Sequence, residues 1–180
     1  MIFKLFSGKE FSMELLTLIT ERHAVRSYQP KKVELEKRNI ILEAGRMAPT
    51  AANLQPVQVL VVEEPASLAK LGKAANLYGA PLALIVCTDR NTVWKRPFDG
   101  KQTTDIDASI VTDHMMLQAT ALGLGSVWIC YFQPDVLREE FQIPDNLEAV
   151  NILAIGYGNE TKVSMKERKS IDQFAFFETT

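Results

Sequence analysis

The longest apolar run in the chain, residues 80–87, places the strongest limit on what the chain can fold into. Its eight residues, Ala-Pro-Leu-Ala-Leu-Ile-Val-Cys, fall far short of the roughly 18 that a membrane-spanning helix needs. A continuous apolar run of this length is typical of a strand that is buried inside a folded domain. We therefore expect a buried strand over residues 82–87 and no membrane span.

Helical and strand patterns alternate along the rest of the chain. Apolar residues at helical spacing predict helices over residues 12–23, 34–48, 66–75, 105–122 and 134–141. Apolar runs predict further strands over residues 57–62, 126–131 and 150–156. No repeat, low-complexity tract or linker interrupts this pattern, so we expect one α+β or α/β domain over residues 1–180.

The apolar stripes of three helices indicate the sides that we expect to face the core. The stripes are formed by Leu15, Leu16 and Ile19, by Ile40, Ala44 and Met47, and by Ile110, His114, Leu117 and Ala121. Ser12 is the expected N-cap of the first helix. Because of its place on the third stripe, His114 is interpreted as a core histidine with satisfied polar atoms rather than as a ligand.

The charge and the cysteines indicate an ordinary intracellular domain. The chain has 180 residues, with 20 lysines and arginines against 22 acidic residues, which gives a net charge of −2. A net charge this close to zero argues against a nucleic-acid-binding protein, which normally carries a basic face or stripe. Cys87 and Cys130 lie in separate apolar runs without a CxxC pair, so we expect both to be buried and reduced. Since the first residues do not form a signal peptide, the sequence predicts a cytoplasmic protein.

The common catalytic motifs are absent from the sequence. Residues 123–125, Gly-Leu-Gly, follow a predicted helix and precede a strand, which is the reverse of the dinucleotide-binding order. There is no GxxxxGK(S/T) phosphate loop and no GxSxG nucleophile elbow. His23 and His114 are the only histidines and the cysteines are not clustered, so we expect no metal site. If the chain is an enzyme, a cofactor has to supply the chemistry.

Two basic segments are candidate anion sites. Arg22 and Arg26 lie four residues apart, so we expect them to face the same way on a helix, and guanidinium groups suit a phosphate or a flavin carbonyl. A solvated basic helix end is the alternative interpretation. The basic run in residues 162–169 is by itself typical of a solvated surface, but together with Arg22 it could form a phosphate clamp.

Two further segments offer contacts to a flat ligand. Small residues in the loop 48–56 let the backbone approach a ligand closely, and Asn53 and Gln55 offer amide groups. A tight helix-to-strand connection is equally consistent with this loop. At the end of the strand that begins at residue 126, the backbone N–H groups of Cys130 or Tyr131 could point toward a ligand.

The polar segment 88–105 is long enough to be a lid, because connections of this length inside a domain are usually functional or mobile. Trp94 and Phe98 within it either stack over a substrate or cover the core. The sequence does not separate these two roles.

The order of the motifs resembles that of a known family. The first three motifs along the chain are an arginine motif after the first helix, Pro-Thr-Ala-Ala-Asn-x-Gln-Pro before the first strand, and an Ala-Pro strand. Next come an Asp-led helix ending in Gly-Leu-Gly-Ser-Val-Trp-Ile, an Ile-Gly-Tyr-Gly strand end and Lys-x-Arg. Over residues 13–174 this order resembles the nitroreductase superfamily of FMN-dependent oxidoreductases. The resemblance implies a three-layer α+β fold with a central mixed, mainly antiparallel sheet flanked by helices.

The resemblance also implies a homodimer with two FMN molecules at the subunit interface and a C-terminal tail exchanged with the dimer partner. The FMN-binding positions that it implies are Arg22, His23, Ala24, Arg26, Pro49, Thr50, Ala51, Asn53, Asn76, Cys130, Tyr131, Lys166 and Arg168. Among these, Arg22, Lys166 and Arg168 would hold the phosphate, and Arg26 would lie near the pyrimidine side of the flavin. The loop 49–53 would come from the other subunit.

This sequence departs from the family pattern at two positions. Ala24 stands where the family usually has a serine, so a hydroxyl bond to the phosphate is lost. Cys130 stands where the family has a glycine, which would narrow the site. Neither departure removes the expected cofactor.

The function that the resemblance implies is FMN-dependent transfer of a hydride from NAD(P)H to a nitroaromatic, a quinone or a similar electron-poor acceptor, by a ping-pong mechanism. The flavin would carry the chemistry, with no catalytic side chain and with no metal, nucleic-acid or membrane partner. Ene reduction, dehalogenation or dehydrogenation on the same scaffold, or a non-catalytic flavin-binding dimer, are the alternatives, because a fold does not fix a substrate.

Overall fold

The computed structural model describes residues 14–159 and 166–178, so Ser12 and Lys162 lie outside the described residues. The strands are β1 (Val57–Val62), β2 (Leu82–Asp89), β3 (Gly125–Ile129) and β4 (Leu147–Gly156). The helices are α1 (Leu15–Glu21), α2 (Leu35–Arg46), the 3-10 turn η1 (Ala51–Asn53), α3 (Pro65–Ala74), α4 (Thr104–Ala121), α5 (Pro134–Phe141) and α6 (Ile171–Phe174). None of the described helices is long and apolar enough to cross a membrane.

The four strands form one sheet in the order β1-β2-β4-β3, with every neighbouring pair antiparallel. One parallel bridge joins Ala24, in the segment after α1, to Ser126 of the edge strand β3. The Val25 N–H donates to the Ser126 carbonyl oxygen at 2.9 Å beside this bridge. Among the described residues the sheet is therefore mainly antiparallel with a single parallel contact, as the family resemblance implies.

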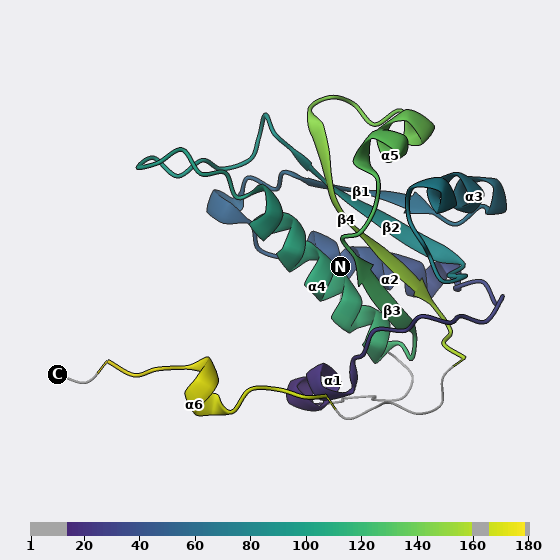
Figure 1. Cartoon of the computed structure of the whole chain (residues 1–180), viewed down its shortest axis with the longest axis horizontal. Helices are drawn as coiled ribbons and strands as arrows, with labels where there is room; N and C mark the ends of the chain where they lie inside the picture. Colours follow the sequence, from purple (N-terminus) through teal and green to yellow (C-terminus); the bar gives the residue numbers. More distant parts are fainter. Residues whose placement is uncertain (1–13, 160–165, 179–180) are drawn as a thin grey trace, which may run out of the picture.

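Strand β2 is buried between two helical layers, which explains its unbroken apolar sequence. Ala83 and Ile85 pack in one apolar cluster with residues of α3 and α5. Leu82 and Leu84 pack in a second cluster with residues of α2 and α4 on the opposite face. Since alternate side chains of a strand point to opposite faces, a strand covered on both sides needs apolar residues at every position. The result is a three-layer α+β fold (Figure 1), and the buried strand predicted over residues 82–87 is confirmed.

The C-terminal end of α4 is a Schellman motif, in which a left-handed residue after the helix lets two N–H groups reach the last carbonyls. Gly123 supplies that residue with φ +74°. Its N–H donates to the Thr120 oxygen at 2.9 Å, and the Leu124 N–H donates to the Ala119 oxygen at 2.9 Å. The Gly-Leu-Gly sequence thus ends a helix and starts β3, in agreement with its exclusion as a dinucleotide motif.

The apolar stripe predicted for α4 was wrong. The buried side is formed by Val111, Met115 and Ala119, while His114 is exposed and its Nδ1 faces the Ile110 oxygen at 3.0 Å within the same helix. His114 is therefore a surface residue and not a core histidine. The helix carries apolar residues on two sides. The side that packs against the sheet begins at Val111, one residue after the first residue of the predicted stripe, Ile110.

The stripes predicted for α1 and α2 were wrong in the same way. The buried residue of α1 is Leu18, while Leu16 is 73% exposed. The buried residues of α2 are Ile41 and Gly45, while Met47 is 66% exposed. One residue turns a helix by about 100°, so an error of one position selects a different face.

The expectation of two buried cysteines holds for Cys87 alone. Its side chain is buried in the sheet, and this burial raises the pKa of its thiol to about 11. Cys130 is exposed because β3 ends at Ile129, two residues earlier than predicted.

Glycine at position 125 is required by a close approach of two segments. A Cβ atom added to Gly125 would lie 2.5 Å from Cγ2 of Val25, in the segment that bridges to β3. We predict that Gly125→Ala lowers the free energy of unfolding by about 1–3 kcal/mol, as is usual for an overpacked core.

Gly72 in α3 is the matched control, because an added Cβ atom there meets nothing within 4 Å. Gly72→Ala should raise the free energy of unfolding by about 0.5–1 kcal/mol through its helix propensity. Urea denaturation followed by circular dichroism checks both values. Equal stabilities of the two variants would contradict the close contact.

Candidate functional site

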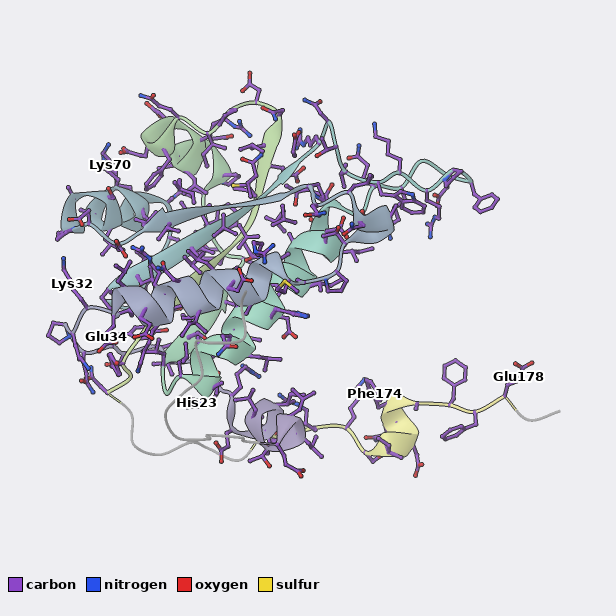
Figure 2. All side chains as sticks on the ribbon, turned by 180° about the vertical axis from the view of Figure 1, so that it is seen from behind. His23, Lys32, Glu34, Lys70, Phe174 and Glu178 are labelled. Carbon is purple, nitrogen blue, oxygen red and sulfur yellow. The ribbon has the colours of Figure 1, made fainter. Side chains whose placement is uncertain are left out.

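A cavity of about 1130 Å³ opens between α1, the C-terminal half of α4 and the segment that begins at residue 166. Arg22, His23, Lys166 and Arg168 line it. Figure 2 shows His23 between α1 and the C-terminal end of α4. The structure therefore brings together the two basic segments that the sequence analysis paired as a phosphate clamp.

The end of α1 and the C-terminal segment are joined at the cavity. Arg22 ends α1 with extended backbone angles, φ −54° and ψ 127°, and the chain then runs to its bridge with β3. The Lys166 Nζ donates to the Ile19 oxygen of α1 at 2.8 Å. This bond places the ammonium group at one wall of the cavity although the two residues are far apart in the sequence.

The cavity carries a concentration of positive charge. Burial lowers the pKa of Lys166, and the nearby charges of Arg22 and Arg168 lower it further. Within residues 14–159 and 166–178 none of these three groups forms an ion pair, although Asp113 also lines the cavity. Positive groups that repel one another in a concave site favour the binding of an anion such as a phosphate.

The loop after α2 lies at the other end of α4 (Figure 1). The Ala51 N–H donates to Asp107 Oδ1 in the first turn of α4 at 2.9 Å. The cavity is lined by Asp113 to Thr120 of the same helix, which lie about 9–20 Å further along at a rise of about 1.5 Å per residue, and no residue of the loop lines it. Pro49, Thr50, Ala51 and Asn53 are therefore not brought to the basic cavity of the same chain.

Similarity to known proteins decides the family of the chain. The sequence profile of the Nitroreductase family matches residues 19–76 and 66–157. The chain belongs to the nitroreductase family. Its fold and the order of its motifs, with the arginine at the end of α1 and the Lys-x-Arg segment at one cavity, agree with this assignment.

Individual relatives of this nitroreductase-family chain cover most of its length. A protein of Archaeoglobus fulgidus with the provisional name NADH dehydrogenase/NAD(P)H nitroreductase is 32% identical over 83% of this chain and 88% of its own. The crystal structure of a nitroreductase family protein from Clostridium difficile 630 is 52% identical, with a TM-score of 0.90 over 93% of this chain and 100% of the other. An FMN-dependent nitroreductase from Clostridium difficile R20291 is 27% identical, with a TM-score of 0.77 over 92% and 100%.

The strand end of the Ile-Gly-Tyr-Gly motif is fixed beside the cavity of this family member. The Tyr157 hydroxyl donates to Glu34 at 2.7 Å and accepts from Lys37 Nζ at 2.9 Å. The bond from Tyr157, followed by a backbone bond and by Lys31, lowers the pKa of Glu34 to about 2. Gly158, the next residue, lines the cavity.

Two other groups of predicted flavin contacts in the nitroreductase-family chain lie apart from the basic cavity. The Asn76 Oδ1 accepts the Tyr78 N–H at 2.9 Å in the turn between α3 and β2, beside a separate hollow. Cys130 follows β3 at a third hollow of about 440 Å³, and Tyr131 beside it is 95% exposed.

The two remaining residues of the arginine motif flank Val25. Ala24 makes the bridge to β3, and Arg26 is exposed and does not line the cavity. The expectation that Arg22 and Arg26 face the same way on a helix was wrong, because α1 ends at Glu21, and of the two arginines Arg22 lines the basic cavity.

The segment predicted as a lid is an ordered hairpin that projects from the domain (Figure 1). Lys95 and Gln102 form an antiparallel bridge, and Arg96 Nε donates to Asp99 Oδ1 at 2.7 Å. Phe98 at the tip is 95% exposed, whereas Trp94 at the base is half-buried. Its role as a lid stays a prediction.

Sequence reasoning missed the part that Asp107 plays and the cavity wall formed by Asp113 and Thr120. An acidic residue in the first turn of a helix is explained by the helix dipole alone, so the sequence did not indicate that Asp107 contacts another segment. Its contact with Ala51 joins residues 56 positions apart and could be found only from the fold.

The electrostatic coupling in the cavity predicts a pH effect. Arg22→Gln removes one positive neighbour, so the pKa of Lys166 should rise toward its ordinary value of 10.5 and Lys166 should keep its proton to higher pH. An NMR titration of the Lys166 Cε methylene signal measures this shift.

Arg26→Gln is the control, because Arg26 carries the same charge in the same motif but does not line the cavity. It should leave the Lys166 titration unchanged. A larger shift in Arg26→Gln than in Arg22→Gln would show that the wrong arginine has been assigned to the anion site.

Proposed function

We propose that this nitroreductase-family chain binds FMN and catalyses the transfer of a hydride from NAD(P)H to an electron-poor acceptor such as a nitroaromatic or a quinone. The observation that carries the proposal is the convergence of Arg22, Lys166 and Arg168 on one concave site. Family membership and the similarity to an FMN-dependent nitroreductase support the choice of cofactor.

The basic cavity fits the phosphate of FMN. A phosphate monoester carries roughly −1.5 to −2 charges near neutral pH. Arg22 and Arg168 offer planar guanidinium groups, which bind phosphate through paired hydrogen bonds, and Lys166 adds a compact ammonium group. With Ala24 in place of a serine, these three charges would supply most of the phosphate binding.

The other flavin contacts require a second copy of the chain. The loop 49–53 contacts α4 at Asp107, and the basic cavity is lined by Asp113 to Thr120 of the same helix, about 9–20 Å further along by the helix rise per residue. A two-fold axis across α4 would bring the loop of one copy to the cavity of the other, since a two-fold interface places the same patch of both subunits together. We therefore propose a homodimer with two sites, each completed by its partner.

The C-terminal segment supports this assembly. Ile171, Phe174, Phe176 and Phe177 are 69%, 79%, 97% and 78% exposed. The segment extends away from the sheet and its helices (Figures 1 and 2). Exposed large apolar residues of this number mark a surface that needs a partner. We propose that the tail packs on the second copy.

The chain's own residues would bind and orient the reactants and exclude water, and no side chain would act as a catalyst. When bound, FMN supplies reversible two-electron storage, which allows the donor to leave before the acceptor enters, as in a ping-pong mechanism. Arg26 would favour negative charge at the pyrimidine side, and the N–H groups of Cys130 or Tyr131 would face the ring. Phe98 and Trp94 would cover the substrate.

A cytoplasmic location of the protein stays a prediction.

Absorbance spectroscopy tests this function. The purified protein should be yellow or take up FMN on titration, and NAD(P)H should bleach it under anaerobic conditions. A nitroaromatic or a quinone should then restore the colour. A colourless protein that takes up no FMN would reject the proposal, and a yellow protein that no nicotinamide donor bleaches would indicate a flavin-binding module or another reductant.

The phosphate site is tested by charge removal. Arg22→Ala and Arg168→Ala should each weaken FMN binding by about 1.5–3 kcal/mol, the usual contribution of a charged hydrogen bond. Lys169→Ala is the control, because Lys169 is exposed and does not line the cavity. Fluorescence titration with FMN measures all three, and unchanged affinity in both arginine variants would contradict the site.

A further inference from the structure

Asp107 is a buried carboxylate with an unusual set of partners. It is 1% exposed and lies in the first turn of α4. Its Oδ1 accepts the Ala51 N–H and its Oδ2 accepts the Thr103 hydroxyl, both at 2.9 Å. In the part of the chain that the structure describes, no cation pairs with it. A buried charge of this kind does not by itself stabilise a fold, because it gives up its hydration.

The loop that Asp107 holds is strained. Ala52, Asn53 and Gln55 have φ values of 51°, 54° and 50°, in the left-handed region that favours glycine. Residues other than glycine keep such a backbone conformation only where neighbouring contacts impose it. Strain of this kind concentrates at functional sites. Two contacts act here: Asp107 accepts the N–H of Ala51, and Thr50 Oγ1 accepts the N–H of Gln55 at 3.0 Å.

We propose that Asp107 is a positioning residue for the cofactor loop, residues 50–55. Its carboxylate fixes the Ala51 N–H and so holds Asn53 in the conformation that meets the flavin of the second copy. This inference rests on the proposed function. Asp107 would thus contribute to cofactor binding through the loop, without touching the cofactor itself.

Because Asp107 lies on α4, its hydrogen bond to the Ala51 N–H ties the loop to a helix that is packed against the sheet. The adjacent residue Ala108 is fully buried in the cluster between α4 and the sheet, so the helix backbone at this point is rigid. The same helix lines the basic cavity with Met116 and Thr120 near its other end. One rigid element therefore fixes both the cavity and the loop that completes the cavity of a second copy.

Two substitutions remove the same hydrogen bond from opposite sides. Asp107→Ala removes the acceptor. Ala51→Pro removes the donor, and it suits the backbone because Thr50 already has the extended angles, φ −131° and ψ 159°, that a residue before proline adopts. Asp107→Asn keeps an oxygen that can accept the Ala51 N–H and serves as the conservative variant. Asp105→Ala is the matched control, an exposed acid in the same turn of the helix.

The first measurement is hydrogen exchange of the apo protein, which does not depend on the flavin. In Asp107→Ala the Ala51 amide should exchange about tenfold faster or more, since local opening replaces a protected bond, while the amide of Leu84 in β2 keeps its protection. Asp107→Asn and Asp105→Ala should leave the Ala51 amide protected. Unchanged exchange of the Ala51 amide in Asp107→Ala would overturn the proposal, as would equal loss of protection at Leu84.

The second measurement is a double-mutant cycle of FMN affinity. Asp107→Ala and Ala51→Pro should each weaken binding about tenfold, and the double variant should lose no more than either single variant, because both remove one bond. Asp107→Asn should restore most of the affinity. Losses that multiply, or no rescue by asparagine, would contradict the positioning role. If the unaltered protein binds no FMN, the proposed function fails, and the exchange of the Ala51 amide still decides whether Asp107 holds the loop.

Discussion

The packing of α4 against the sheet is the constraint on which the rest of the structure depends. Val111, Met115 and Ala119 lie in one apolar cluster with Leu84 and Leu153 of the two central strands. The helix cannot turn without exposing these residues. Its C-terminal end delivers the chain into β3 through Gly123, and its first turn holds the loop after α2. The stretch of this helix between Asp107 and the cavity-lining residues 113–120 therefore sets the distance between the cofactor loop and the basic cavity.

The proposed homodimer would account together for three features that a single chain leaves unsatisfied. Three cations converge without an ion pair among the described residues, three non-glycine residues near position 53 are left-handed, and the aromatic tail is exposed. Natural proteins break local rules mainly at functional sites. A phosphorylated cofactor held between two copies would neutralise the charges, use the strained loop and cover the tail.

The sequence predicted the parts of the fold that depend on local pattern. The apolar run of β2 identifies a strand covered on both faces, and Gly123 marks the end of α4. The charge pattern suggested that Arg22 and the basic run around Lys166 and Arg168 could form a phosphate clamp, the family resemblance implied the same three residues, and the structure places them at one cavity. The buried sides of the helices could not be predicted, because α4 is apolar on two sides and only the sheet selects one. The exposure of Cys130 depends on where β3 stops pairing, and the bond between Ala51 and Asp107 joins residues that no sequence pattern links.

Complementation between two variants tests most directly whether each site is shared by two copies. Arg22→Ala damages the cavity and Asp107→Ala damages the loop, so in a mixed dimer one site carries both defects and the other carries none. When the two variants are unfolded, mixed in equal amounts and refolded together, random pairing in a two-fold dimer should give about a quarter of the sites the FMN affinity of the unaltered protein. A titration of the mixture that equals the average of the two separate variants would contradict a site completed by a second copy.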